Sequence, residues 1–123
     1  MKLRPEILLL ILLQITTAFA ASYEDLTYQT KFFNNTLDHL APFQPSQPTY
    51  SQRYLVNDDF FGQKDPLSDG CPGPIFLYTG NEGPVTAFWN SNGFMKYLAE
   101  KYGGLLLFFE ERYYGESIPT EEC

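Results

Sequence analysis

The second half of the chain contains two apolar runs that predict neighbouring β-strands. They are residues 74–80, "PIFLYTG", and residues 105–111, "LLLFFEE". Near-continuous apolar runs of this length are typical of parallel strands that are buried on both faces of a sheet. In the first half, shorter apolar stretches predict a strand at residues 51–58 and another around residues 31–33. Residues 41–50 hold three prolines and predict a loop.

Residues 92–102, "NGFMKYLAEKY", predict a helix between the two apolar strands. Three residues recur at helical spacing and mark its apolar face: Phe94, Leu98 and Tyr102. Asn92 is a typical N-cap residue, and Gly103 is typical of a helix stop. Strand, helix and strand within about 40 residues predict a βαβ unit with parallel strands. We therefore expect an α/β fold.

The single predicted helix cannot cover both faces of so apolar a sheet. Strands that are buried on both faces need cover on both sides, and aromatic residues make up 17% of the sequence. Several of these aromatic side chains follow one another closely between residues 108 and 114 and require neighbours. We expect the chain to be the first part of a larger α/β fold, incomplete without downstream chain.

Residues 1–20 have the layout of a secretory signal peptide. Two basic residues precede an apolar run at residues 7–13, and the stretch closes with a small-x-small pattern at residues 18–20. A membrane anchor is the alternative, but spanning a bilayer takes about 20 apolar residues. We expect cleavage after Ala20, which leaves a domain of residues 21–123 in the secretory pathway, destined for an extracellular, lysosomal or vacuolar compartment.

The charge balance excludes two classes of partner. The formal net charge is −7, whereas a nucleic-acid-binding surface requires a basic face. Attachment to anionic lipid requires basic residues as well. Beyond these exclusions, acidity indicates solubility only.

The secretory route gives meaning to three further residues. Asn34 begins the sequon "NNT" and is a candidate for N-glycosylation. Cys71 and Cys123 are candidates for disulfide bonds in an oxidising compartment. Their places in the predicted parallel strands set them about 20 Å apart, so pairing with cysteines outside this chain is an equal alternative. The only histidine is His39, so we expect no metal site, and we expect no cofactor.

The segment "TGNEGP" at residues 79–84 follows the first apolar strand at its carboxyl end. Ligands bind at this edge in open α/β sheets. A glycine-rich turn there lets backbone N–H groups face a developing negative charge, and α/β-hydrolases take one oxyanion-hole donor from such a loop. A tight turn without chemistry explains the residues equally well. Phosphate binding is disfavoured because no G-K-[ST] follows and Glu82 would repel an anion.

Five sequence blocks occur in an order and spacing that resemble one known family. They are "LDHL" (37–40), "QRYLVND" (52–58), "PIFLYTGNEG" (74–83), "NGFM" (92–95) and "ERYYGESIP" (111–119). Over roughly residues 31–119 the chain resembles the opening of the proline-specific serine peptidases, which include Pro-X carboxypeptidases, dipeptidyl peptidase II and thymus-specific serine protease. The resemblance implies an α/β-hydrolase domain with a helical cap inserted later. It also implies a Ser-Asp-His triad and cleavage next to proline, often at acidic pH.

Three residues depart from the family pattern. Glu111 stands where the family usually has histidine, Pro84 where it has aspartate, and Leu40 where it has phenylalanine. The change at Glu111 replaces a switchable cation with an anion beside Glu110. It therefore bears on local packing and on the response to pH more than on the fold.

The catalytic triad itself is expected downstream of Cys123. Ser117 lies in "GESIP", which lacks the last glycine of G-x-S-x-G and follows the wrong strand, so it is interpreted as a loop residue. His39 falls in the "LDH" segment, where the family does not have its catalytic histidine. Because α/β-hydrolases order the triad as Ser, Asp, His, all three members are expected beyond this chain.

The resemblance assigns supporting roles to the loop after the first apolar strand. Candidates for the oxyanion hole and the substrate pocket are Gly80, Asn81, Glu82 and Gly83. The Glu82 carboxylate suits a cationic group such as a free amino terminus. Alternatively, Glu82 caps the following helix or pairs with Arg112.

Two main functions remain in competition, with a remote third. The first is the N-terminal portion of a secreted or lysosomal serine exopeptidase, either a carboxypeptidase or a dipeptidyl peptidase, inactive as an isolated chain. Its substrate would be a peptide with proline near the scissile bond. A second copy of the chain is a further candidate partner, in a homodimer. The second is a non-catalytic secreted binding or regulatory module derived from that fold. The remote interpretation makes the chain itself a hydrolase that uses Ser117, His39 and one of its aspartates.

Overall fold

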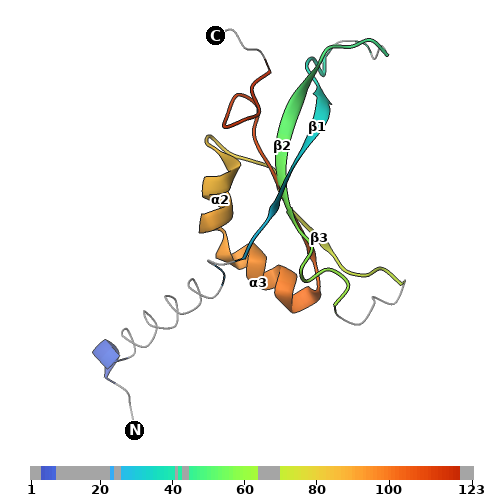
Figure 1. The fold of residues 1–123 in the computed structure, drawn as a ribbon. Helices are drawn as coiled ribbons and strands as arrows, with labels where there is room; N and C mark the ends of the chain where they lie inside the picture. The colour runs from blue at the N-terminus through green and yellow to red at the C-terminus, as the bar shows by residue number, and fades with distance from the viewer. Residues whose placement is uncertain are drawn as a thin grey trace.

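Among the described residues, four strands and two helices form a single layered arrangement (Figure 1). The computed structural model describes residues 4–7, 23, 26–40, 42, 45–63 and 70–119. In chain order, the elements are β1 (Gln29–Thr36), β2 (Thr49–Asn57), β3 (Ile75–Tyr78), α2 (Val85–Ser91), α3 (Gly93–Tyr102) and β4 (Leu105–Phe109). Both helices lie on the same side of the strands (Figure 1).

The sheet is mixed, with strand order β1-β2-β4-β3. β2 pairs antiparallel with both β1 and β4, whereas β3 and β4 are parallel, with Ile75 opposite Leu105 and Tyr78 opposite Phe108. The chain crosses from β3 to β4 through α2 and α3, because parallel neighbours need a crossover connection. The predicted α/β class and the βαβ unit are therefore confirmed.

The two strands of the first half are longer than their sequence predicts. The strand expected around residues 31–33 extends over eight residues, and the strand expected at residues 51–58 starts at Thr49. The last two residues of the proline-rich loop predicted at residues 41–50 therefore belong to β2. Pairing of all of β1 with residues 49–56 of β2 supplies the backbone hydrogen bonds that favour this extension.

Helix α3 begins and ends where the sequence predicts. The Asn92 side chain accepts a hydrogen bond from the Met95 amide, and Gly103 ends the helix in the left-handed conformation at φ 65°. The predicted apolar face is wrong, however, since Phe94 is 66% exposed and Tyr102 is 51% exposed. Helix α2 already covers part of the sheet, so α3 turns a different side toward the core.

The residues that α3 buries are Lys96 and Ala99. The Lys96 ammonium lies 4.8 Å from the centre of the Trp89 ring and donates to the Tyr23 carbonyl at 3.2 Å. Burial lowers the pKa of Lys96. A buried ammonium is tolerated here because an aromatic face and a carbonyl oxygen replace part of its hydration.

Helix α2 was not predicted from the sequence. It spans seven residues after Pro84, and its buried residues are Val85 and Trp89. Seven residues are two helical turns, which carry too little periodicity to be distinguished from a loop. Proline just before the first turn is a helix-start signal, because its fixed φ suits that position.

The core lies between the helices and one face of the sheet. Its buried side chains are Leu55, Val85, Trp89, Ala99, Leu106 and Phe108. Phe108 stacks on Tyr78 at 5.2 Å between ring centres, and its edge meets Trp89 at 4.9 Å. Aromatic pairs in these geometries add about 0.5–1.5 kcal/mol beyond area burial.

The other face of the sheet is apolar and open. Ile75 is 60% exposed and Leu77 is 52% exposed, so the expectation that residues 74–80 are buried on both faces is wrong. A shallow hollow of about 320 Å³ on this face is lined by Phe33, Tyr54, Leu107 and Phe109. Strand periodicity identifies apolar positions but does not say whether a second layer covers them.

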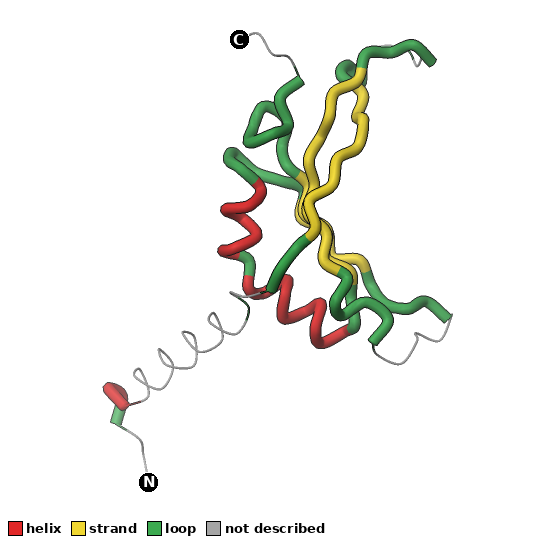
Figure 2. The backbone as a smooth tube through the Cα atoms, in the orientation of Figure 1, coloured by secondary structure: helices red, strands yellow, loops and turns green. Residues whose placement is uncertain are grey.

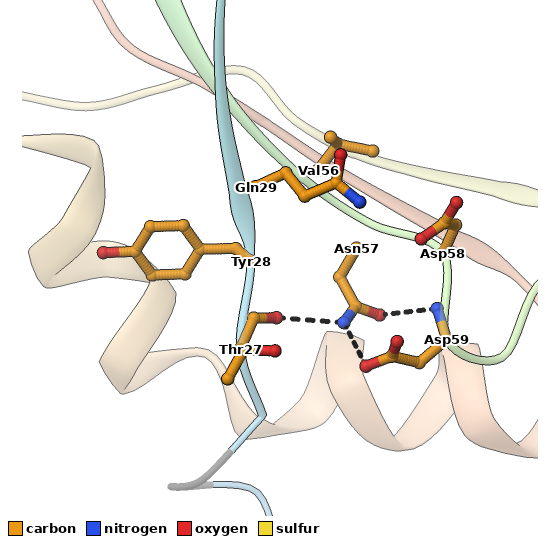
Figure 3. Close-up of a pocket in the computed structure, with 7 residues that line it drawn as sticks. All are labelled: Thr27, Tyr28, Gln29, Val56, Asn57, Asp58 and Asp59. Atoms are coloured by element: carbon orange, nitrogen blue, oxygen red, sulfur yellow. Dashed lines mark hydrogen bonds between the residues drawn. The ribbon is translucent and has the colours of Figure 1, made fainter.

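The described residues before β1 contact both helices and the end of β2. The Trp89 indole donates to the Leu26 carbonyl at 3.1 Å. At the edge of a small polar hollow, the Asn57 amide donates to the Thr27 carbonyl at 2.9 Å and to the Asp59 carboxylate at 2.6 Å (Figure 3). The Tyr23 hydroxyl bonds the Glu100 carboxylate, and burial with this contact raises the pKa of Tyr23 to about 12.

The predicted signal peptide lies outside the described residues apart from residues 4–7, and so do its cleavage site and Cys123. Among the described residues, no helix has the length and hydropathy that crossing a bilayer requires.

The one-sided core predicts different costs for two leucine truncations. Leu106→Ala should destabilise the chain by about 2–5 kcal/mol, because Leu106 is fully buried against the helices. Leu77→Ala, on the open face of the neighbouring strand, should cost about 1 kcal/mol or less. Urea unfolding followed by the fluorescence of buried Trp89 measures both. Equal losses in the two variants would contradict this one-sided core.

Candidate functional site

Two loops meet at the carboxyl edge of the parallel strands β3 and β4. Residues 79–84 leave β3 and residues 110–119 leave β4, and both run toward the same end of the molecule (Figure 2). Gly80 holds them in contact, because a Cβ there would lie 2.8 Å from the Glu111 nitrogen and 3.1 Å from the Phe109 oxygen. Gly80 also has φ +95°, which side-chain-bearing residues rarely adopt.

The loop after β3 is closed by Asn81. Its side-chain oxygen accepts from the Glu82 amide at 2.8 Å, and its backbone carbonyl accepts from the Gly83 amide at 2.7 Å. Asn81 and Glu82 are both exposed at this edge. Because the amides of Glu82 and Gly83 are engaged within the loop, Gly80 and Asn81 are the better candidates to donate to a ligand.

A buried carboxylate lies directly beneath the two loops. Glu110 follows β4, is fully buried, and accepts four kinds of donor. Oε2 accepts from the Val85 amide at 3.0 Å, while Oε1 accepts from the Glu116 amide at 2.8 Å and the Ser117 hydroxyl at 2.9 Å. The Arg53 Nε lies 3.2 Å from both oxygens. The carboxylate therefore joins β2, the start of α2 and the loop after β4.

Arg53 supplies the compensating charge. It lies on β2, is almost fully buried, and forms ion pairs with Glu110 and Glu116. Its backbone amide donates to Ser117 Oγ at 2.9 Å. Burial alone would raise the pKa of Glu110, but the hydrogen bonds from Arg53, Val85, Glu116 and Ser117 together lower it below the ordinary glutamate value.

This group of five residues was missed by sequence reasoning. Arg53 and Glu110 are 57 positions apart, and no local motif links them. A signal was nevertheless present, since Glu110 directly follows an apolar strand and a charge there requires a partner.

Ser117 and His39 take no part in a catalytic centre within the described residues. Ser117 is fully buried in the loop after β4, where its hydroxyl donates to Glu110 and accepts from the Arg53 amide. A hydroxyl so engaged with a carboxylate and an amide is a structural group and has no imidazole partner. His39 lies exposed in the bend after β1.

The two alternatives for Glu82 fail on geometry. Helix α2 has Pro84 at its N-cap and no side-chain cap. Arg112 instead donates to the Leu37 carbonyl at 2.8 Å and lies over the Tyr50 ring at 5.2 Å. Within the described part of the chain, Glu82 has no ion-pair partner, so its carboxylate is presented to solvent at the sheet edge.

The remaining candidate residues are Glu111 in the loop after β4, Asn34 on β1 and Cys71 before β3. Glu111 is exposed, so its departure from the family pattern does not disturb buried packing. Asn34 is exposed on β1, and Cys71 is half-buried with its thiol 3.3 Å from the Gly73 carbonyl. The described residues contain no group of three or more potential metal ligands.

The amino-acid sequence matches a family model for the serine carboxypeptidases S28 over residues 35–123. The chain belongs to the S28 family. It is 40% identical to bovine lysosomal Pro-X carboxypeptidase over 94 residues, which cover 76% of this chain and 17% of that protein. The corresponding human protein is 40% identical over 92 residues, covering 75% and 17%. A probable serine protease of Arabidopsis thaliana, EDA2, is 33% identical over 94 residues, covering 76% and 17%.

The chain therefore spans about a sixth of the length of these S28 relatives. The match includes both loops at the carboxyl edge of the sheet, residues 79–84 and 110–119. Membership of the S28 family confirms the resemblance to proline-specific serine peptidases.

The contact between the two loops predicts that Gly80 tolerates no side chain. Gly80→Ala should destabilise the chain by at least about 1–2 kcal/mol, because the residue has positive φ and a Cβ would overlap the Glu111 backbone. Gly93→Ala is the matched control, since a Cβ there meets open space at the start of α3 and should be neutral or slightly stabilising. Urea midpoints measure both, and a tolerant Gly80 would refute the close approach.

Proposed function

We propose that this S28 chain is the N-terminal portion of a serine exopeptidase that cleaves next to proline and travels the secretory route. Its contribution is the loop of residues 79–84, which borders the oxyanion hole and the substrate pocket. The observation that carries the proposal is the contact of this glycine-bearing loop with the end of β4, at the carboxyl edge of the parallel pair. The names of its lysosomal and carboxypeptidase relatives support the class of reaction and the compartment.

The chemistry follows from the groups that the loop presents. The amides of Gly80 and Asn81 donate toward the oxygen that becomes negative when a peptide carbonyl is attacked. Each such donor contributes about 3 kcal/mol of transition-state stabilisation when it is held in place beforehand. The exposed Glu82 carboxylate binds a cationic group of the substrate, of which a free amino terminus is the simplest.

The nucleophile and the rest of the fold belong to downstream chain in this proposal. Parallel sheets are covered on both faces, whereas the described helices cover one face only and leave Ile75 and Leu77 exposed. The chain spans 17% of its relatives, so a family-length protein has ample sequence for a second layer and for a Ser-Asp-His triad. The chain alone is therefore inactive.

An activity test separates the peptidase from a non-catalytic module. The 123-residue chain should show no turnover of chromogenic Xaa-Pro substrates. Joined to the part of human lysosomal Pro-X carboxypeptidase that follows the matched region, it should restore turnover. Clear turnover by the chain alone would contradict the proposal that the triad lies in downstream chain. A joined protein that folds but does not turn over substrate would favour the binding or regulatory module.

The role of Glu82 predicts a change in KM. In the joined protein, Glu82→Gln should raise KM about tenfold or more for substrates with a free amino terminus, because a charge-assisted contact contributes about 1.5–3 kcal/mol. Substrates with a blocked amino terminus should be unaffected, and kcat should stay the same. Glu111→Gln is the matched control, since it removes the same charge from an exposed neighbour. An unchanged KM for free amines would refute the recognition role.

A further inference from the structure

We propose that Glu110 is the positioning residue of the S28 site: its carboxylate fixes the loop of residues 79–84 against the end of β4. The consequence for catalysis rests on the proposed function, in which this loop donates to the oxyanion. The contacts that hold the loop in place do not depend on that function. Glu110 touches no reacting atom and acts through the backbone that it holds.

Both ends of the loop are anchored on the same short stretch of chain. At its start, Gly80 packs against the Phe109 carbonyl and the Glu111 amide. At its end, the amide of Val85 donates to Glu110 Oε2 at 3.0 Å. Residues 109–111 therefore hold the loop at two points, and Glu110 is the only side chain among these contacts.

Helix α2 makes this second anchor necessary. Pro84 at the N-cap offers no side-chain acceptor, and no side-chain cap is present at this helix. The first amides of a helix lack partners within the helix and need acceptors from elsewhere. Glu110 provides this acceptor for the Val85 amide. Because Glu110 follows β4 and is distant in sequence, the contact links the start of α2 to the end of β4.

A carboxylate is the group that this position requires. Two donors converge on Oε1, from Glu116 and Ser117, while Val85 donates to Oε2 and Arg53 reaches both oxygens. A glutamine of the same shape has one acceptor oxygen and one NH₂ group. At least one set of donors would then face another donor in a buried space.

The charges that face Glu110 decide its response to acid. Arg53 approaches from β2, Glu116 lies beyond Arg53 in the loop after β4, and α2 presents only the Val85 amide. The pKa of Glu110 is lowered in the fold. Its stabilising contribution is therefore fully present above the unfolded pKa of about 4.3, and it is lost as pH falls through the lower folded value.

Amide hydrogen exchange of the full 123-residue chain tests the proposal. Relative to wild type, Glu110→Gln should accelerate exchange at the amides of residues 82, 83 and 85 about tenfold to a hundredfold more than at Leu106 and Phe108 in β4. Glu111→Gln removes the same charge from an exposed neighbour and should leave both regions unchanged. Equal acceleration at the loop and at β4 would show that Glu110 serves general stability and would overturn the positioning role, as would no acceleration.

A second measurement needs no variant and applies even where Glu110→Gln does not fold. In the wild-type chain, the Val85 and Glu116 amide proton shifts should titrate together with one midpoint below pH about 4.3, because both donate to one carboxylate. A Val85 shift that does not follow the Glu116 shift would refute the link. Neither experiment uses substrate. A failed positioning role would thus leave the peptidase proposal standing, and absent turnover in the joined protein would leave the positioning role standing.

Discussion

The buried pair of Glu110 and Arg53 is the constraint on which the arrangement of the sheet edge depends. A charged pair inside a protein costs several kcal/mol in lost hydration, and this cost is offset only when every remaining lone pair and proton is satisfied. Here the hydrogen bonds come from Val85 at the start of α2 and from Glu116 and Ser117 in the loop after β4, which are two separate segments. Because the charges need these donors, the donors are brought together, and the two loops at the carboxyl edge take their places as a result.

The two faces of the sheet are covered to different extents by the described residues. On the helix side, Phe108 and Leu106 are fully buried under α2 and α3. On the other side, Phe33, Tyr54 and Phe109 form an aromatic cluster that packs within itself and stays open to solvent. Stacking within one sheet face recovers only part of the area that a second layer would bury. The two loops at the carboxyl edge are therefore supported by a well-packed side, while the other side leaves Ile75 and Leu77 exposed.

The sequence predicted the elements whose signals are local and missed the features that depend on distant partners. The caps of α3, Asn92 and Gly103, need only neighbouring residues, and both were predicted correctly. The inward turn of Lys96 depends on Trp89 and Tyr23, which pattern analysis does not bring together. The Glu110 group was missed for the same reason. The loop of residues 79–84 was placed correctly because parallel pairing follows from the strand–helix–strand order along the chain, whereas its chemical role stays a prediction.

The same geometry explains which departures from the family pattern the chain tolerates. Glu111 differs from the usual histidine, but it is exposed and its neighbour Glu110 carries the buried contacts. Pro84 replaces an aspartate that would be a good N-cap, yet the first amide of α2 keeps an acceptor because Glu110 supplies it. Gly115 has no such freedom, since a Cβ there would lie 2.1 Å from a Glu110 oxygen. Substitutions are therefore tolerated at Glu111 and Pro84, whose side chains do not touch the Glu110 carboxylate. A side chain at Gly115 is excluded because it would touch that carboxylate, as expected when one buried charge sets the position of a loop.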